Sequence, residues 1–183
     1  MSTIVMPEMA PADTLHETVN GERREGSHLS PLGAMVASLL LSHLHDFTLG
    51  RKRGVMAVKT LFRLREKPRL ERRPHLAFVA DDRLTAPFQP PDGRAAWDIV
   101  PNLAVEVITP TITVDDLVDK ISDYFAHGVA LVWVVYPRQR LIYVYQSRFQ
   151  LKVLDVNGTL DGGSVIPGFA LKVSDLFGAL VKP

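Results

Sequence analysis

The stretch that decides the fold reads LAVEVIT over residues 103–109, PTITVDDLVDKISDYFAHGV over residues 110–129 and ALVWVVY over residues 130–136. The outer segments are short apolar runs, typical of strands buried on both faces. The middle segment has its apolar residues at helical spacing, at Leu117, Ile121, Tyr124 and Phe125. Two buried strands that flank a helix return parallel to each other, so the sequence predicts a strand–helix–strand unit at the centre of an α/β domain.

Glu106 is the one charged residue in the first of these strands. Alternation along the strand places it between Ala104 and Ile108 on a covered face. A buried carboxylate costs several kcal/mol unless a cation or a set of donors meets it. Two interpretations are open: a functional site, or a structural ion pair with Lys120 on the following helix. Lys120 itself has a simpler alternative, as the i, i+4 partner of Asp116 on a solvated helix face.

Composition sets the limits of the fold. The chain has 183 residues, 46% of them hydrophobic, which predicts a single domain over residues 14–183 behind a flexible tail of residues 1–13. There is no cysteine, which excludes disulfides, thiolate zinc sites and cysteine nucleophiles. With neither an apolar run of eighteen residues nor a signal-peptide pattern, we expect a cytoplasmic protein with no membrane span.

The N-terminal half begins with an expected hairpin over residues 16–25, in which Asn20-Gly21 forms a type I′ turn and Glu17 lies on the first arm. As an isolated residue Glu17 is more often solvated. A helix is expected from Ser30-Pro31 to Gly50. His43 falls on or beside its apolar stripe and lacks a paired carboxylate, so we expect it to pack rather than to bind metal.

Two further strands are expected over residues 54–64 and 76–80, paired through a basic turn, with a loop from residue 83 to 101. Residues 51–73 hold ten of the 21 Lys and Arg residues against two Glu. This segment predicts either a DNA-phosphate contact or an ordinary solvated hairpin. Alternating patterns over RLIYVYQS and FQLKVLDV indicate an antiparallel pair near the C-terminus.

The order of these elements closely resembles the Uma-two (Uma2) family of restriction-endonuclease-like proteins, in the PD-(D/E)XK nuclease superfamily. HETVNGE resembles the family's Glu-bearing hairpin, RRPHLAFV its Arg-Pro-Asp strand, VEV its catalytic Glu strand and VDDLVDKISDYFAHGV its Lys- and Tyr-bearing helix. The resemblance implies a restriction-endonuclease-like mixed β-sheet core flanked by helices.

The resemblance also implies hydrolysis of DNA with a divalent metal, Mg²⁺ or Mn²⁺. By position, Glu106, Lys120 and Glu17 are the implied catalytic residues, and Glu106, His75 and Glu17 the implied metal ligands. His75 stands where the family has Asp, and an imidazole suits Mn²⁺ better than Mg²⁺ and brings no negative charge. The aspartate common before the Glu strand is Asn102 here, and Asp98 is the nearby acid that would replace it.

Two functions therefore remain open from the sequence. The first is a DNA endonuclease, with the basic segment holding phosphate. The second is an inactive protein of the same fold that binds nucleic acid or protein. Exposed strand edges also predict a homodimer.

Overall fold

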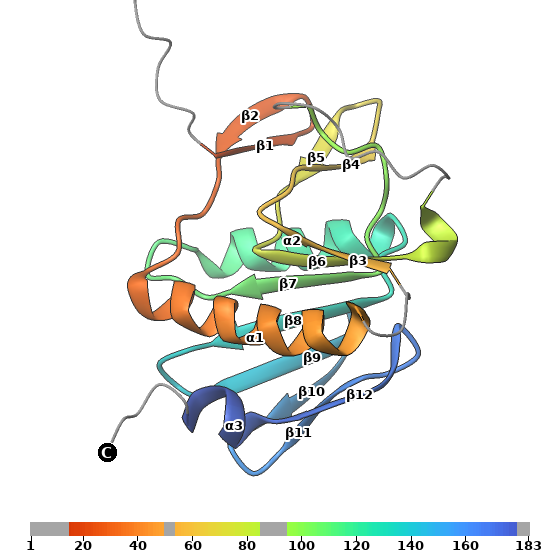
Figure 1. The fold of residues 1–183 in the computed structure, drawn as a ribbon. Coiled ribbons are helices and arrows are strands. Elements are labelled where there is room, and N and C mark those ends of the chain that lie inside the picture. Colours follow the sequence, from red (N-terminus) through yellow and green to blue (C-terminus); the bar gives the residue numbers. More distant parts are fainter. Residues whose placement is uncertain (1–14, 50–53, 85–94, 179–183) are drawn as a thin grey trace, which may run out of the picture.

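The structure, a computed structural model, describes residues 15–49, 54–84 and 95–178. Its centre is a six-stranded sheet of order β10-β9-β8-β7-β6-β3 (Figure 1). β7 and β8 are parallel, and the other neighbours in this sheet are antiparallel. The strands are β3 Gly54–Val58, β6 Leu76–Ala80, β7 Leu103–Val107, β8 Leu131–Tyr136, β9 Leu141–Ser147 and β10 Gln150–Leu154. The predicted fold class, a mixed sheet with flanking helices, is confirmed.

The strand–helix–strand unit forms as the sequence predicts. Helix α2, Val114–Ala126, connects β7 to β8, and Glu106 lies opposite Val134 in the parallel register. All five residues of β7 are buried. The Thr113 side chain accepts a hydrogen bond from the Asp116 amide and caps the start of α2. Gly128, at φ +94°, follows the C-cap and supplies the left-handed residue that ends the helix.

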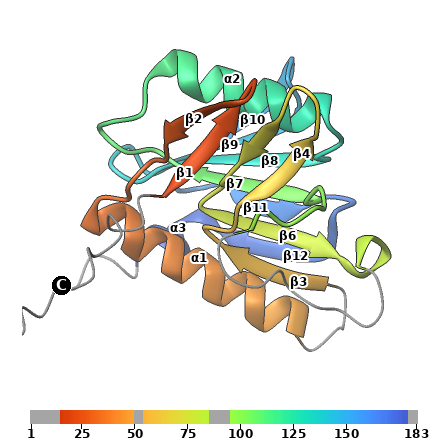
Figure 2. The same cartoon turned by 90° about the horizontal axis from the view of Figure 1, so that it is seen from above.

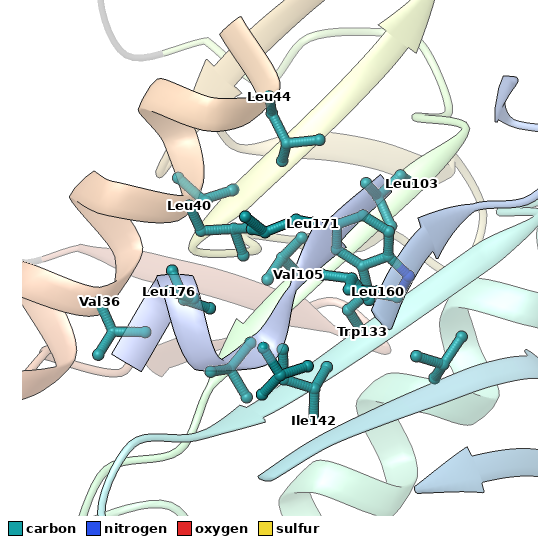
Figure 3. Close-up of a cluster of buried hydrophobic side chains, with 14 of the residues drawn as sticks. Val36, Leu40, Leu44, Leu103, Val105, Trp133, Ile142, Leu160, Leu171 and Leu176 are labelled. Atoms are coloured by element: carbon teal, nitrogen blue, oxygen red, sulfur yellow. The ribbon is translucent and has the colours of Figure 1, made fainter. Parts of the chain in front are cut away.

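One face of the central sheet is covered by helices and a β-hairpin. The covering elements are α1 Pro31–Leu49, β11 Thr159–Gly162, β12 Ile166–Lys172 and α3 Val173–Gly178. Between them and the sheet lies the larger apolar core, in which Leu40 and Leu44 of α1 approach Leu103 and Trp133 (Figure 3). Since these side chains are fully buried, packing positions α1 on the sheet.

The buried stripe of α1 differs from the prediction at Met35 and at His43, which are both exposed. Val36, Leu40 and Leu44 are fully buried, whereas His43 is exposed. The expectation that His43 packs is therefore wrong: Leu44 occupies the core face one residue further on. By length and composition α1 is also apolar enough to cross a membrane, and its buried stripe packs on the sheet.

The opposite face carries α2 and a second, four-stranded sheet of order β2-β1-β5-β4 (Figure 2). Its strands are β1 His16–Val19, β2 Glu22–Glu25, β4 Phe62–Arg65 and β5 Leu70–Arg72. Asn20 and Gly21, at φ +52° and +85°, form the β1–β2 turn, as a type I′ turn requires. This small sheet brings β1, with Glu17, over the β6–β7 part of the central sheet.

The single strand expected over residues 54–64 is wrong. The segment divides into β3, which pairs with β6 of the central sheet, and β4, which pairs with β5 of the small sheet. Lys59 turns the chain between them with φ +45°. The expected basic turn also contains a strand, β5, whose residues 70–72 are buried between β1 and β4. In the expected loop 83–101, Trp97 stacks on Phe62 with ring centroids 5.6 Å apart.

The tail expected over residues 1–13 and part of the 83–101 loop, residues 85–94, lie outside the described residues. A short 3-10 turn, η1 Asp81–Arg83, opens that loop.

Candidate active site

Glu106 lies on the α2 side of β7 with none of its surface exposed. Three side chains meet its carboxylate. Tyr124 donates its hydroxyl to Oε1 at 2.7 Å, Lys120 donates its ammonium to Oε1 at 3.1 Å, and His75 Nδ1 lies 2.8 Å from Oε2. Both carboxylate oxygens are therefore bonded, which compensates for the loss of water around a buried charge.

The contact between His75 and Glu106 assigns the imidazole proton. An ionised carboxylate only accepts hydrogen bonds, so Nδ1 must carry the proton in this pair. The Val107 amide nitrogen lies 3.2 Å from the same Nδ1, and a protonated Nδ1 leaves no lone pair for it. Nε2 is the other ring nitrogen of His75. It is buried and has no hydrogen-bond partner among the described residues.

These contacts determine the ionisation of the site. Burial alone would raise the pKa of Glu106, but the Lys120 ammonium and the hydrogen bonds from His75 and Tyr124 outweigh it and lower the pKa to about 2. Burial would lower the pKa of Lys120, but Glu106 and Glu17 raise it above its ordinary value. Burial beside Glu106 raises the pKa of Tyr124 well above that of a free phenol. Glu106 and Lys120 are therefore charged at neutral pH, and Tyr124 is a neutral donor.

Glu17 faces the same cluster from β1 and is 4% exposed. Its Oε1 accepts from the Arg73 backbone amide at 2.8 Å and lies 2.8 Å from Lys120 Nζ. Its Oε2 accepts from Arg72 Nη1 at 3.0 Å. The idea that Glu17 is a solvated hairpin residue is therefore wrong.

Lys120 connects the two acids. Its Nζ lies 2.8 Å from Glu17 Oε1 and 3.1 Å from Glu106 Oε1. The alternative that pairs it with Asp116 on a wet helix face is wrong: the Lys120 side chain is 6% exposed, and Asp116 Oδ2 instead accepts from the Thr113 hydroxyl at 2.6 Å. The ammonium thus marks a cation position that both carboxylates face.

Comparison with known proteins gives the family. The sequence profile of Uma2, described as "Putative restriction endonuclease", matches residues 5–174. The chain belongs to the Uma2 family. Its fold matches the crystal structure of a "putative nuclease belonging to DUF820" from Anabaena variabilis with a TM-score of 0.79, at 15% sequence identity and over 91% of each chain. Comparison with curated proteins finds no match.

Asn102 and Asp98, the two positions considered for the family's second aspartate, both lie away from this cluster. Asn102 has a structural contact: its Oδ1 accepts from the Ala80 amide at 2.9 Å, which connects the start of β7 to the end of β6. Asp98 is 79% exposed in its side chain and lies 3.9 Å from Arg63 Nη1 on the small sheet. Asp98 therefore does not replace the missing aspartate in the arrangement seen here.

Sequence reasoning gave no role to two residues of the cluster. Arg72 is 4% exposed and bridges Glu17 to Asp123 of α2. Its sequence context is a run of basic residues, in which nothing distinguishes it from the less buried arginines nearby. Tyr124 was assigned to the apolar stripe of α2. The signal for its polar contact was present, since it follows Lys120 by four residues and so lies beside it on the helix.

Most described arginines of the basic segment are paired within the protein. Arg63 Nε lies 3.5 Å and Arg69 Nε 2.8 Å from Glu71 Oε1. Arg65 donates to Asn20 and to the Pro68 carbonyl, and Arg73 donates to two backbone carbonyls. These contacts stabilise the small sheet, and phosphate binding by this segment stays a prediction.

The donor chemistry of the cluster is compatible with a divalent ion. Among the described residues, no group of three or more His, Asp or Glu side chains is placed to hold a metal. However, Mg²⁺ is commonly held by one or two carboxylates together with substrate phosphate and water. Glu17 and Glu106 provide two carboxylates that share one cation position, with the Lys120 ammonium as its stand-in. His75 Nδ1 faces Glu106, so its role as a ligand stays a prediction.

Proposed function

We propose that this protein is a divalent-metal-dependent DNA endonuclease, in which Glu17 and Glu106 hold the ion. The observation that carries the proposal is the convergence of both acids on the Lys120 ammonium at 2.8 and 3.1 Å. Family membership and the nuclease-like fold support nucleic acid as the substrate. When bound, the ion would supply a water of lowered pKa and offset charge on the phosphate.

The residues of the chain have separate roles in this proposal. Lys120, once it leaves the shared cation position, places a positive charge beside the scissile phosphate, where it stabilises the developing negative charge. Tyr124 and His75 hold the Glu106 carboxylate by one oxygen each. Arg72 and the Arg73 amide hold Glu17. This support holds both carboxylates in position before substrate arrives.

A second function, DNA binding without cleavage, is favoured by one observation. All four oxygens of the two acids are bonded to protein donors, and His75 stands at the position where the family has an acid. With one negative charge fewer, we expect cleavage to be slower with Mg²⁺ than with Mn²⁺, which accepts nitrogen ligands more readily.

The test is plasmid nicking with Mg²⁺ and with Mn²⁺ by the wild-type protein and by Glu106→Gln, purified in parallel. Endonuclease function predicts nicking that requires the metal and falls to background in Glu106→Gln. Gln keeps the size of the side chain and removes its charge, so circular dichroism should show the same fold. If Glu106→Gln nicks as fast as the wild type, the site assignment is wrong. Metal-independent DNA retention without nicking would establish the second function.

A further inference from the structure

A cavity of about 640 Å³ opens beside the two acids. Glu17, Arg72 and Lys120 line it on the side of the cluster. Its other walls come from β2, from the segment before α1 and from the segment before α2. Figures 1 and 2 show both helices starting at the same end of the central sheet, below the β1–β2 hairpin. The volume lies in the range of cavities that hold a small organic ligand.

The walls away from the acids combine apolar surface with hydroxyl groups. Leu29, Pro110 and Ile112 supply the apolar surface. Ser27 Oγ lies 3.4 Å from Thr109 Oγ1, which lies 3.1 Å from Thr111 Oγ1. Apolar walls suit the faces of a nucleobase, and a row of hydroxyls can donate to or accept from its edge.

Three carboxylates (Glu17, Glu25, Asp116) and three cations (Arg24, Arg72, Lys120) line the cavity, so a phosphate at its mouth depends on the cation that the protein leaves unpaired. Arg24 lies opposite Glu17 in the β1–β2 register and lines the cavity. It makes no ion pair with any described residue, whereas Glu25 is paired with His28, 3.6 Å away. The N-termini of α1 and α2, which carry the positive ends of the helix dipoles, also begin at this cavity.

We infer that this cavity takes one unpaired nucleotide, with its base between the apolar walls and its phosphate toward Arg24 and Lys120. The inference rests on the proposed function and names its substrate class: single-stranded or locally unpaired nucleic acid. A base stacked in a duplex cannot enter such a cavity without leaving the stack, and the energy needed is smallest for strands that are already unpaired.

The experiment measures binding in EDTA, so that cleavage does not enter. Fluorescence anisotropy compares a labelled single-stranded 12-mer with the blunt duplex of the same sequence. We expect the wild type to bind the single strand at least 10-fold more tightly. Thr111→Leu fills part of the cavity with an exposed, apolar side chain and should remove this preference by weakening single-strand binding alone. Ser27→Leu reaches the cavity from another segment and should act in the same way.

Thr159→Leu is the matched control, because Thr159 is an exposed threonine on β11, outside this cavity. It should leave both affinities unchanged. Equal affinity of the wild type for the two DNA forms, or no binding of either, overturns the inference. So does a preference that persists in both Thr111→Leu and Ser27→Leu. Metal-dependent nicking by a protein without single-strand preference would leave the proposed function standing, so the two failures are distinguishable.

Discussion

His75 and Glu106, 31 residues apart in the chain, lie side by side with Nδ1 and Oε2 2.8 Å apart. His75 precedes β6, and its backbone amide donates to the Val105 carbonyl of β7 at 3.0 Å, so the strand pairing itself sets the two side chains next to each other. A histidine here orients the acid by a hydrogen bond. An aspartate, as the family has, would add a second negative charge to the same buried space.

We therefore predict opposite effects of His75→Asp without and with metal. Without metal, two carboxylates in contact within the core should lower the free energy of unfolding by about 3 kcal/mol. With Mn²⁺ or Mg²⁺ the added acid becomes a ligand, so the melting temperature should rise more steeply with metal concentration than in the wild type. Differential scanning calorimetry across a metal titration measures both effects, and plasmid nicking should increase in parallel.

His75→Asn is the control for that substitution, since it has the same shape as Asp without the charge and can donate to Glu106. It should be more stable than His75→Asp in EDTA and should show no metal-dependent rise beyond that of the wild type. Identical metal responses of the two variants would show that position 75 is not part of a cation site.

The lowered pKa of Glu106 predicts acid sensitivity. A group whose pKa is depressed by folding stabilises the protein above its unfolded pKa, and this contribution is lost as the pH falls through the folded value. For Glu106 the window runs from 4.5 down to about 2, and the lost contribution is about 3 kcal/mol. Urea unfolding from pH 6 to pH 2.5 should show this loss in the wild type. Glu106→Gln should lack it, and a decline of equal steepness in both proteins would contradict the shift.

The sequence was sufficient to predict the centre of the fold and insufficient for the small sheet. Glu106 stood out because a charge interrupted an apolar strand, and the alternation of β7 correctly placed it with Ala104 on a covered face, which the structure shows to be the face that α2 covers. Arg72 could not be distinguished in the same way, because its burial depends on β5 lying between β1 and β4, a long-range pairing that leaves no local pattern. Three residues, Leu70–Arg72, are also too few to show a period.

Tyr124 provides a test of how Glu106 is held. Tyr124→Phe removes the hydroxyl donor at 2.7 Å and leaves Oε1 with Lys120 alone. Loss of one donor to a buried carboxylate should cost about 1–3 kcal/mol in the free energy of unfolding, measured by urea titration. The half-buried Tyr143 of β9 is the control, and Tyr143→Phe should cost less. Equal costs would mean that the hydroxyl contributes little to holding Glu106.

The last prediction concerns the basic segment. If Arg63, Arg65 and Arg69 contact phosphate, reversing all three to Glu should weaken duplex DNA binding and flatten the dependence of log K on log salt by up to about 2.7, since each lost contact removes about 0.9 from the slope. Because Arg63 and Arg69 also pair with Glu71, the variant is expected to be less stable, and binding is measured where circular dichroism shows it folded.

The matched control for this triple variant reverses three exposed arginines beyond β8, Arg138, Arg140 and Arg148. It changes the net charge by the same amount on a different part of the surface. A general charge effect would change the salt dependence of DNA binding in both triple variants alike. A phosphate contact at the small sheet would flatten the slope of log K against log salt in the first variant alone. Equal slopes in the two variants would assign Arg63, Arg65 and Arg69 to the stability of that sheet, the role that their contacts with Glu71 and Asn20 already support.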